Sequence, residues 1–229
     1  MKTKDRLKLK GLIMLLLLTN FWSAWAAPGR GSGSIPGYTS SNVFINGDGD
    51  YLLVSEQYSF SNQGGGPSYF KYDPDGALTE KIFERSDGIR TVTRYFYDKR
   101  GILLESIRDF GNGKKDLFSY IYNDQRKLVK RVMKRSNGQR GSESYLYGPK
   151  GELAEARWIN FDGWISGTIR FQHNNKHQIT KGQFRGKRFN AEIDFSYDSN
   201  GNLHRIHWQF SFGQSQTYVF KYRKKRSNP

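Results

Sequence analysis

The chain contains no cysteine among its 229 residues, and this absence excludes several classes of protein. Without thiols there is no disulfide scaffold, no thiolate zinc or iron–sulfur site and no cysteine nucleophile. Proline is scarce, with 6 residues, and acidic residues are outnumbered, with 21 Asp and Glu against 37 Lys and Arg. Mean hydropathy is −0.76, too polar for a bundle of membrane helices, whereas an aromatic content of 15% is too high for a disordered chain.

The longest uncharged stretch, residues 11–29, lies near the N-terminus and has the features of an export signal. It follows a leader with five Lys and Arg residues and contains Ala24-Trp25-Ala26, the small-x-small pattern of a signal peptidase site. We therefore predict a signal peptide over residues 1–26 and a periplasmic or extracellular protein with no transmembrane span after cleavage. A retained N-terminal anchor is the alternative, because this stretch could almost cross a bilayer. The leader holds four of the sixteen net positive charges, so the mature chain keeps +12.

The rest of the chain repeats with a period of 25 residues. Three columns keep this period: a tyrosine, an aromatic residue two positions before it, and a leucine six positions after it. The first two columns include Tyr95, Tyr97, Tyr120, Tyr122, Tyr145 and Tyr147, and the leucines are Leu53, Leu78, Leu103, Leu128, Leu153 and Leu203, with Ile179 in the same column. Such a period indicates a repeat architecture. We predict a linker rich in Gly, Ser and Pro over residues 27–41, a repeat domain over 42–222 and a basic tail over 223–229.

Each repeat contains two turn signals. Segments such as Asp98-Lys99-Arg100-Gly101 favour a type I turn followed by a bulge, and pairs such as Asn137-Gly138 favour two-residue type I′ hairpins. The runs between the turns are rich in Tyr, Phe, Val, Ile and Thr, which is typical of strands. We predict an all-β fold: an antiparallel meander of about 14–15 strands that coils or closes into a barrel, because wide sheets twist and open edges aggregate. Mid-strand charges on both faces, such as Lys81 and Lys130, argue against a membrane barrel.

The turns also predict which residues share a face. Both turn types place tyrosine and leucine as cross-strand partners, with Tyr72 opposite Leu78 and Leu78 opposite Tyr97. Strict alternation then puts a second apolar column on the opposite face, so that each face mixes apolar and polar residues. This second column consists of Tyr58, Phe83, Met133, Trp158, Phe184 and Trp208.

The unit aromatic-x-Tyr-Asp-x-x-Gly-x-Leu resembles the YD repeat of the bacterial Rhs family and the related teneurins. Residues 70–78, 95–103 and 195–203 carry the motif, and degenerate copies extend it to about seven units over residues 44–222. The resemblance implies a β-hairpin repeat fold. In that family long arrays form shells that enclose a toxin or serve adhesion, whereas about seven units are too few to enclose one.

Candidate catalytic and metal sites are weak. On a regular strand His204 and His207 would point to opposite faces, so neither a metal site nor a hydrolase site forms unless one of them meets a carboxylate. Residues 46–50 copy part of a calcium loop but lack its later ligands, and we interpret them as a turn. We predict no catalytic residues, no metal and no cofactor.

The positive charge is the feature most open to a functional interpretation. Our leading hypothesis is an exported, non-enzymatic binding module that holds an anionic polysaccharide, lipopolysaccharide or phospholipid surface, or a protein partner, on an aromatic and basic face. Export argues against nucleic acid as the ligand. The candidate binding residues are Tyr95, Tyr97, Tyr120, Tyr122, Tyr145, Tyr147, Arg94, Arg131 and Trp158. The alternatives are a hydrolase that uses His204 or His207, and an envelope assembly factor with an apolar edge that takes up a partner strand.

Overall fold

The computed structural model describes residues 51–60, 65–86, 88–161 and 165–224. The predicted signal peptide, the linker over 27–41 and the turn at 46–50 lie outside these residues. In the described part, the last strand continues to Lys224, two residues past the predicted end of the repeat domain.

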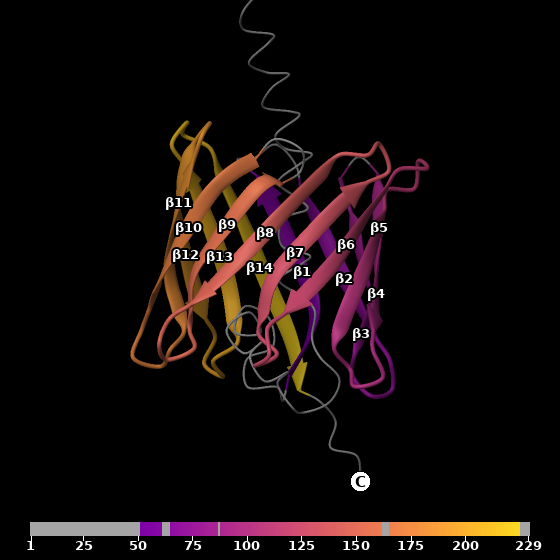
Figure 1. Cartoon of the computed structure of the whole chain (residues 1–229), viewed down its shortest axis with the longest axis horizontal. Helices are drawn as coiled ribbons and strands as arrows, with labels where there is room; N and C mark the ends of the chain where they lie inside the picture. Colours follow the sequence, from indigo (N-terminus) through magenta and orange to yellow (C-terminus); the bar gives the residue numbers. More distant parts are fainter. Residues whose placement is uncertain (1–50, 61–64, 87, 162–164, 225–229) are drawn as a thin grey trace, which may run out of the picture.

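Fourteen antiparallel strands follow one another around a closed barrel (Figure 1). They are β1 (Tyr51–Phe60), β2 (Gly65–Tyr72), β3 (Leu78–Glu84), β4 (Arg90–Tyr97), β5 (Leu103–Asp109), β6 (Lys115–Tyr122), β7 (Leu128–Arg135), β8 (Arg140–Tyr147), β9 (Leu153–Phe161), β10 (Ile165–His173), β11 (Ile179–Gly186), β12 (Asn190–Tyr197), β13 (Leu203–Phe210) and β14 (Ser215–Lys224). β1 pairs with β14, so the meander closes on itself. The all-β prediction and the barrel-like sheet are confirmed. None of the described residues form a helix that is long and apolar enough to cross a membrane.

The turns at the tyrosine end of the barrel, where the even-numbered strands finish, have the predicted geometry. In the loop after β4 the amide of Gly101 donates to the carbonyl of Asp98, and Gly101 has a φ of 78°. The Asp98 carboxylate accepts hydrogen bonds from the amides of Arg100 and Ile102, at 2.8 Å each. The repeated aspartates are therefore explained by turn geometry, as their position in the motif suggested.

The turns at the opposite end differ from the prediction. The amide of Arg135 bonds the carbonyl of Gln139, and the amide of Gly138 bonds the carbonyl of Arg135. This is a three-residue loop with a type I turn and a left-handed glycine, so the predicted two-residue type I′ turn is wrong here. The longer loop shifts the register by one residue, and Leu78 does not stand directly opposite Tyr97.

A β-bulge at the tyrosine end changes the predicted faces as well. In seven strand pairs, one extra residue separates the leucine from the body of its strand; in β5 this residue is Leu104, because Tyr97 pairs with Leu103 while Phe96 pairs with Glu105. Beyond the bulge the alternation of side chains is inverted. The column that includes Trp158 and Trp208 therefore lies inside the barrel together with the tyrosines and leucines, and its prediction on the opposite face is wrong.

The tyrosine and leucine columns do share the inner face, and most hydroxyls in the tyrosine column form a recurring contact. The hydroxyl of Tyr72 donates to the carbonyl of Leu53 at 2.8 Å, and that of Tyr197 donates to the carbonyl of Ile179 at 2.9 Å. Tyr97 and Tyr147 make the same bond to Leu78 and Leu128. Each bond ties one repeat to the leucine strand of the repeat before it.

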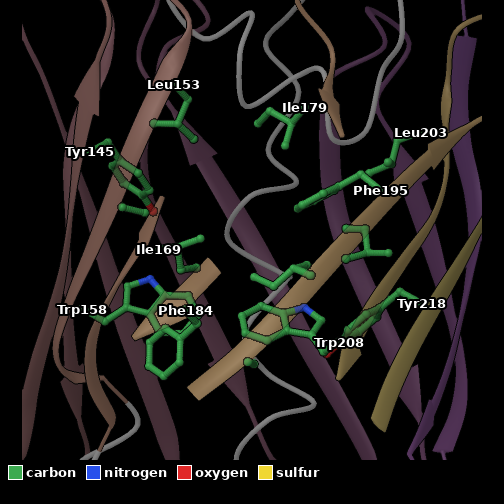
Figure 2. Close-up of a cluster of buried hydrophobic side chains, with 14 of the residues drawn as sticks. Tyr145, Leu153, Trp158, Ile169, Ile179, Phe184, Phe195, Leu203, Trp208 and Tyr218 are labelled. Atoms are coloured by element: carbon green, nitrogen blue, oxygen red, sulfur yellow. The ribbon is translucent and has the colours of Figure 1, made fainter. Parts of the chain in front are cut away.

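The inner face divides into two halves of different chemistry. The half formed by β9–β14 is mainly apolar and aromatic, with Gln216 of β14 as a buried polar side chain. The rings of Trp158 and Trp208, from β9 and β13, stack with centroids 6.1 Å apart (Figure 2). Phe184 of β11 lies between these strands, and a Cβ on Gly167 or Gly186 would come within 2.6 Å of its ring. The half formed by β1–β8 buries charged residues among its aromatic rings.

Candidate functional site

Six charged side chains are buried inside β1–β8, and they neutralise one another. Lys81 bonds Glu56 at 2.8 Å, with both side chains at most 4% exposed. Arg108 pairs with Asp116, and Arg131 pairs with Glu143 through both carboxylate oxygens, at 2.9 and 3.0 Å. Three cations therefore face three anions, and the buried set carries no net charge.

Arg131 and Arg108 are the most enclosed of these cations, each with at most 1% of its side chain exposed. The Arg131 guanidinium lies 4.8 Å from the ring centre of Phe118, which Arg108 also contacts, at 5.1 Å. Burial by itself would lower the pKa of Arg131, but the Glu143 carboxylate outweighs it, and the net pKa lies above the ordinary arginine value. The Arg131 guanidinium therefore stays charged and serves as a structural partner of Glu143.

Most of the predicted binding residues point into the barrel. The rings of Tyr95, Tyr120 and Tyr145 are at most 5% exposed, and Trp158 and Arg131 are buried as well. Tyr97, Tyr122 and Tyr147 line the same inner face and are partly buried. Only Arg94 lies on the outer face, where it pairs with Glu80 at 3.1 Å. The structure therefore does not bring the nine residues together on one exposed aromatic and basic face, because the inner columns are used for packing; a ligand role for any of them stays a prediction.

The excess positive charge lies outside the buried set. Residues 51–224 contain 29 Lys and Arg and 18 Asp and Glu, a net of +11. Because the six buried groups cancel, this whole excess is carried by the remaining residues. The outer wall, rather than the inner face, is where an anionic ligand would find uncompensated charge.

One part of the outer wall concentrates this charge. Lys130 and Lys134 of β7, Arg140 of β8 and Arg157 of β9 are all exposed and face outward; we call them the basic panel. Within the described chain none of the four makes an ion pair. Glu155 is the single acidic residue on the outer face of these three strands, and Arg170 of β10 binds it at 3.4 Å.

The register brings the basic panel together. Lys134 stands directly opposite Arg140, an arrangement of like charges that destabilises a sheet unless an anion lies nearby. Lys130 and Arg157 stand on either side of Ser144, so they lie about 10 Å apart across two strand spacings. None of the four is among the nine candidate binding residues, because the sequence shows their charge but not the face on which they lie.

The histidines are placed differently from the prediction. Because the bulge in β13 lies between them, His204 and His207 both project from the outer face, and the prediction of opposite faces is wrong. His207 contacts the hydroxyl of Thr217 at 2.9 Å and stands opposite Asp194. Burial and the neighbouring Arg205 lower the pKa of His207, against the opposing effect of Asp194.

Neither a metal centre nor a catalytic constellation is visible in the described residues. No three of their His, Asp and Glu side chains are grouped so that they could hold a metal ion. A shallow groove of about 560 Å³ lies at the end of the barrel opposite the tyrosine end, between β1, β2 and β3. Its lining offers Glu84 and Arg85 as ionised groups and no histidine.

The comparisons with known proteins identify no family. No protein-family model matches the chain, and no curated protein matches it in sequence. Among solved structures, a porin-like protein from Bacteroides uniformis is similar with a TM-score of 0.45 and 10% identity, over 75% of this chain and 96% of that one. A porin-like protein from Bacteroides vulgatus gives a TM-score of 0.46 and 9% identity, over 75% and 98% of the two chains.

A further likeness is to the TcdB2-TccC3-Cdc42 complex, with a TM-score of 0.31 and 15% identity. It covers 68% of this chain and only 10% of that one, so this chain spans a small part of that protein's length. These TM-scores are too low to carry an argument about function. The chain is a β-barrel built from repeated antiparallel hairpins, and its function has to be argued from its own residues.

Proposed function

We propose that this protein is an exported, non-enzymatic β-barrel that binds anionic surfaces of the cell envelope through its outer wall. The relevant ligand chemistry is a set of closely spaced phosphate or carboxylate groups, as found on lipid headgroups and acidic polysaccharides. The hairpin repeat that resembles the Rhs and teneurin unit supplies, on this proposal, a rigid scaffold rather than an enclosing shell.

A single observation carries the proposal: the buried charges cancel, and the whole excess of eleven positive charges remains outside them. On the outer wall the basic panel brings four cations together without an ion pair in the described chain. An anion bound there would relieve the repulsion between Lys134 and Arg140. Long-range attraction of this kind weakens as salt screens it.

The closed barrel does not favour the assembly-factor alternative in its strand-addition form. Every described strand is paired on both sides, so the described part of the sheet has no free edge for a partner strand. His207 stands opposite Asp194 on the outer face, and no observation favours hydrolysis.

Retention on an immobilised acidic polysaccharide and on vesicles with anionic lipid, each measured at low and high salt, tests the proposal. The wild-type protein should bind at low salt, and Lys134→Gln/Arg140→Gln should elute at clearly lower salt. Lys71→Gln/Lys115→Gln is the matched control, because it removes the same net charge from cations that already pair with Glu80 and Asp109. Equal elution of the two double variants, or binding that ignores salt, would contradict a site on the basic panel.

A further inference from the structure

One outward-facing position at the tyrosine end changes character around the barrel. On even strands it is the residue just before the repeat tyrosine, and on odd strands it is the extra residue of the bulge. Over six adjacent strands, β4 to β9, this position is apolar, and we call these residues the apolar rim: Phe96, Leu104, Ile121, Val129, Leu146 and Ala154. On seven of the other eight strands it is polar: Lys71, Thr79, Gln172, Thr180, Ser196, His204 and Lys221.

Four of the six rim residues are exposed, and Val129 and Ala154 are partly buried. Leu146 is 59% exposed, Leu104 and Ile121 are 46% exposed and Phe96 is 44% exposed, although each stands within a strand. Because the strands are about 4.8 Å apart, the rim extends about 24 Å around the wall. A continuous exposed apolar feature of this kind marks an interaction surface rather than random surface composition.

Cations flank the apolar rim on both sides. The three loops beyond it, 98–102, 123–127 and 148–152, carry exposed Lys99, Arg100, Arg126 and Lys150. The other three described loops at this end, 73–77, 174–178 and 198–202, carry a single cation, Lys176. On the opposite side of the rim, Lys130 and Arg157 of the basic panel lie toward the middle of the wall, whereas Lys134 and Arg140 lie farther away, at the other ends of β7 and β8. Acidic residues also lie in these loops and beside the rim: Asp98, which binds Arg100 at 3.3 Å, Asp124, Glu152, Glu105 and Glu155, which binds Arg170. The three loops keep a net positive charge, because they hold five Lys and Arg against three Asp and Glu.

We infer that the apolar rim docks the barrel onto a lipid bilayer that contains anionic headgroups. In this arrangement the rim side chains enter the boundary between headgroups and acyl chains, and the flanking cations contact the headgroups on either side. Charge complementarity selects this occupant, because apolar side chains between two groups of cations match an anionic lipid surface. An acidic polysaccharide would use the cations and leave the apolar rim in water. The inference rests on the proposed function and specifies its ligand.

The outer wall limits the contact to the side of the barrel that carries the rim. Arg170, Lys181 and Asp194 project from β10, β11 and β12 in the middle of the strands. Charges at such positions are unfavourable against hydrocarbon. The inferred contact is therefore peripheral, along one corner of the barrel.

Flotation with vesicles tests the inference. Vesicles of phosphatidylcholine alone are compared with vesicles that also contain phosphatidylglycerol. The wild-type protein should float with the anionic vesicles, and Phe96→Ser/Ile121→Ser/Leu146→Ser should lower its partition coefficient by about tenfold or more. Polar residues at this position are compatible with the fold, since Ser196 and Gln172 occupy it in other repeats. Tyr69→Ser/Ile159→Ser is the matched control, because both residues are 46% exposed and lie outside the rim.

A gain of function separates docking from a structural effect. Gln172→Leu/Ser196→Leu adds apolar residues to the same position on β10 and β12 and should raise vesicle binding. If the rim variant binds anionic vesicles as well as the control does, the rim inference is wrong while the proposed function stands. If the wild-type protein binds acidic polysaccharide but neither kind of vesicle, the rim inference is again wrong while the proposed function stands. If the wild-type protein binds no anionic ligand at all, both the rim inference and the proposed function are wrong. A wild-type dimer that the rim variant converts to a monomer, seen by light scattering without vesicle binding, would identify a second copy of the chain as the occupant and overturn the lipid inference.

Discussion

Replacing Glu143 by glutamine should strongly destabilise the barrel, because it leaves the charge of Arg131 buried without its carboxylate. The two side chains are at most 1% exposed and are joined by two contacts of 2.9 and 3.0 Å. Removing one partner of such a pair costs about 3–5 kcal/mol. With a urea m-value of about 2–3 kcal/mol/M, the midpoint of unfolding should fall by about 1–2.5 M.

Urea unfolding followed by circular dichroism measures this shift, and two further variants test its cause. Glu105→Gln changes an exposed glutamate and should cost less than about 0.5 kcal/mol. Arg131→Met/Glu143→Leu removes both charges and should recover most of the loss; the remaining deficit of about 1–2 kcal/mol reflects the Tyr145 hydroxyl, which donates to Glu143 in the native barrel. If the double variant loses as much free energy of unfolding as Arg131→Met and Glu143→Leu lose together when made separately, an uncompensated charge is not the cause of the loss.

Two further predictions concern the tyrosine column. Tyr197→Phe should lower the free energy of unfolding by about 1 kcal/mol, measured with urea, because it deletes the 2.9 Å hydrogen bond to the Ile179 carbonyl. Tyr122→Phe should be nearly neutral, because the Tyr122 hydroxyl makes no hydrogen bond in the described structure. Equal losses in the two variants would contradict this reasoning. Burial raises the pKa values of Tyr72 and Tyr122 above 10.0, the unfolded-state value, so their contribution to stability is complete below pH 10 and is lost as the pH rises through the folded-state values. Tyrosinate absorbance and circular dichroism should therefore change together above pH 10, and ionisation near pH 10 with an intact spectrum would exclude this linkage.

The sequence was sufficient to predict the strands, the turns at the tyrosine end and the shared face of the tyrosine and leucine columns. Each depends on local signals, such as the Asp98 carboxylate that bonds its own loop. The prediction that tyrosines and leucines share a face was correct, but it did not include two shifts of the strand register. The longer loop at Arg135–Gln139 shifts the register in one direction and the bulge at the tyrosine end shifts it in the other, so the two errors cancel at the tyrosines and leucines.

The errors do not cancel in the middle of the strands, and this is why the candidate site could not be located from the sequence. Lys130 and Arg131 are adjacent cations with the same sequence signal, yet Lys130 faces outward and Arg131 is 1% exposed. A shift of one residue exchanges their faces. The extra residue of a bulge is visible only in the pairing between strands: Phe96 pairs with Glu105 and Tyr97 with Leu103, which leaves Leu104 between the two pairs. Sequence alone could therefore count the cations but could not divide them between the inner and outer faces.

The repeat also explains how one wall of the barrel could acquire a surface that the other wall lacks. Inward positions are constrained, since the tyrosines bond neighbouring backbone and the large rings contact one another across several strands. The outward position before each tyrosine has no such constraint, and it accommodates Lys71, Phe96, Ser196 and other residues on the same backbone. Apolar side chains at this position on three consecutive even strands, together with cations in the loops that follow them, require no change in the fold. A barrel made of nearly equivalent hairpins can thus carry a localised docking surface, because its outer residues vary independently of the packing inside.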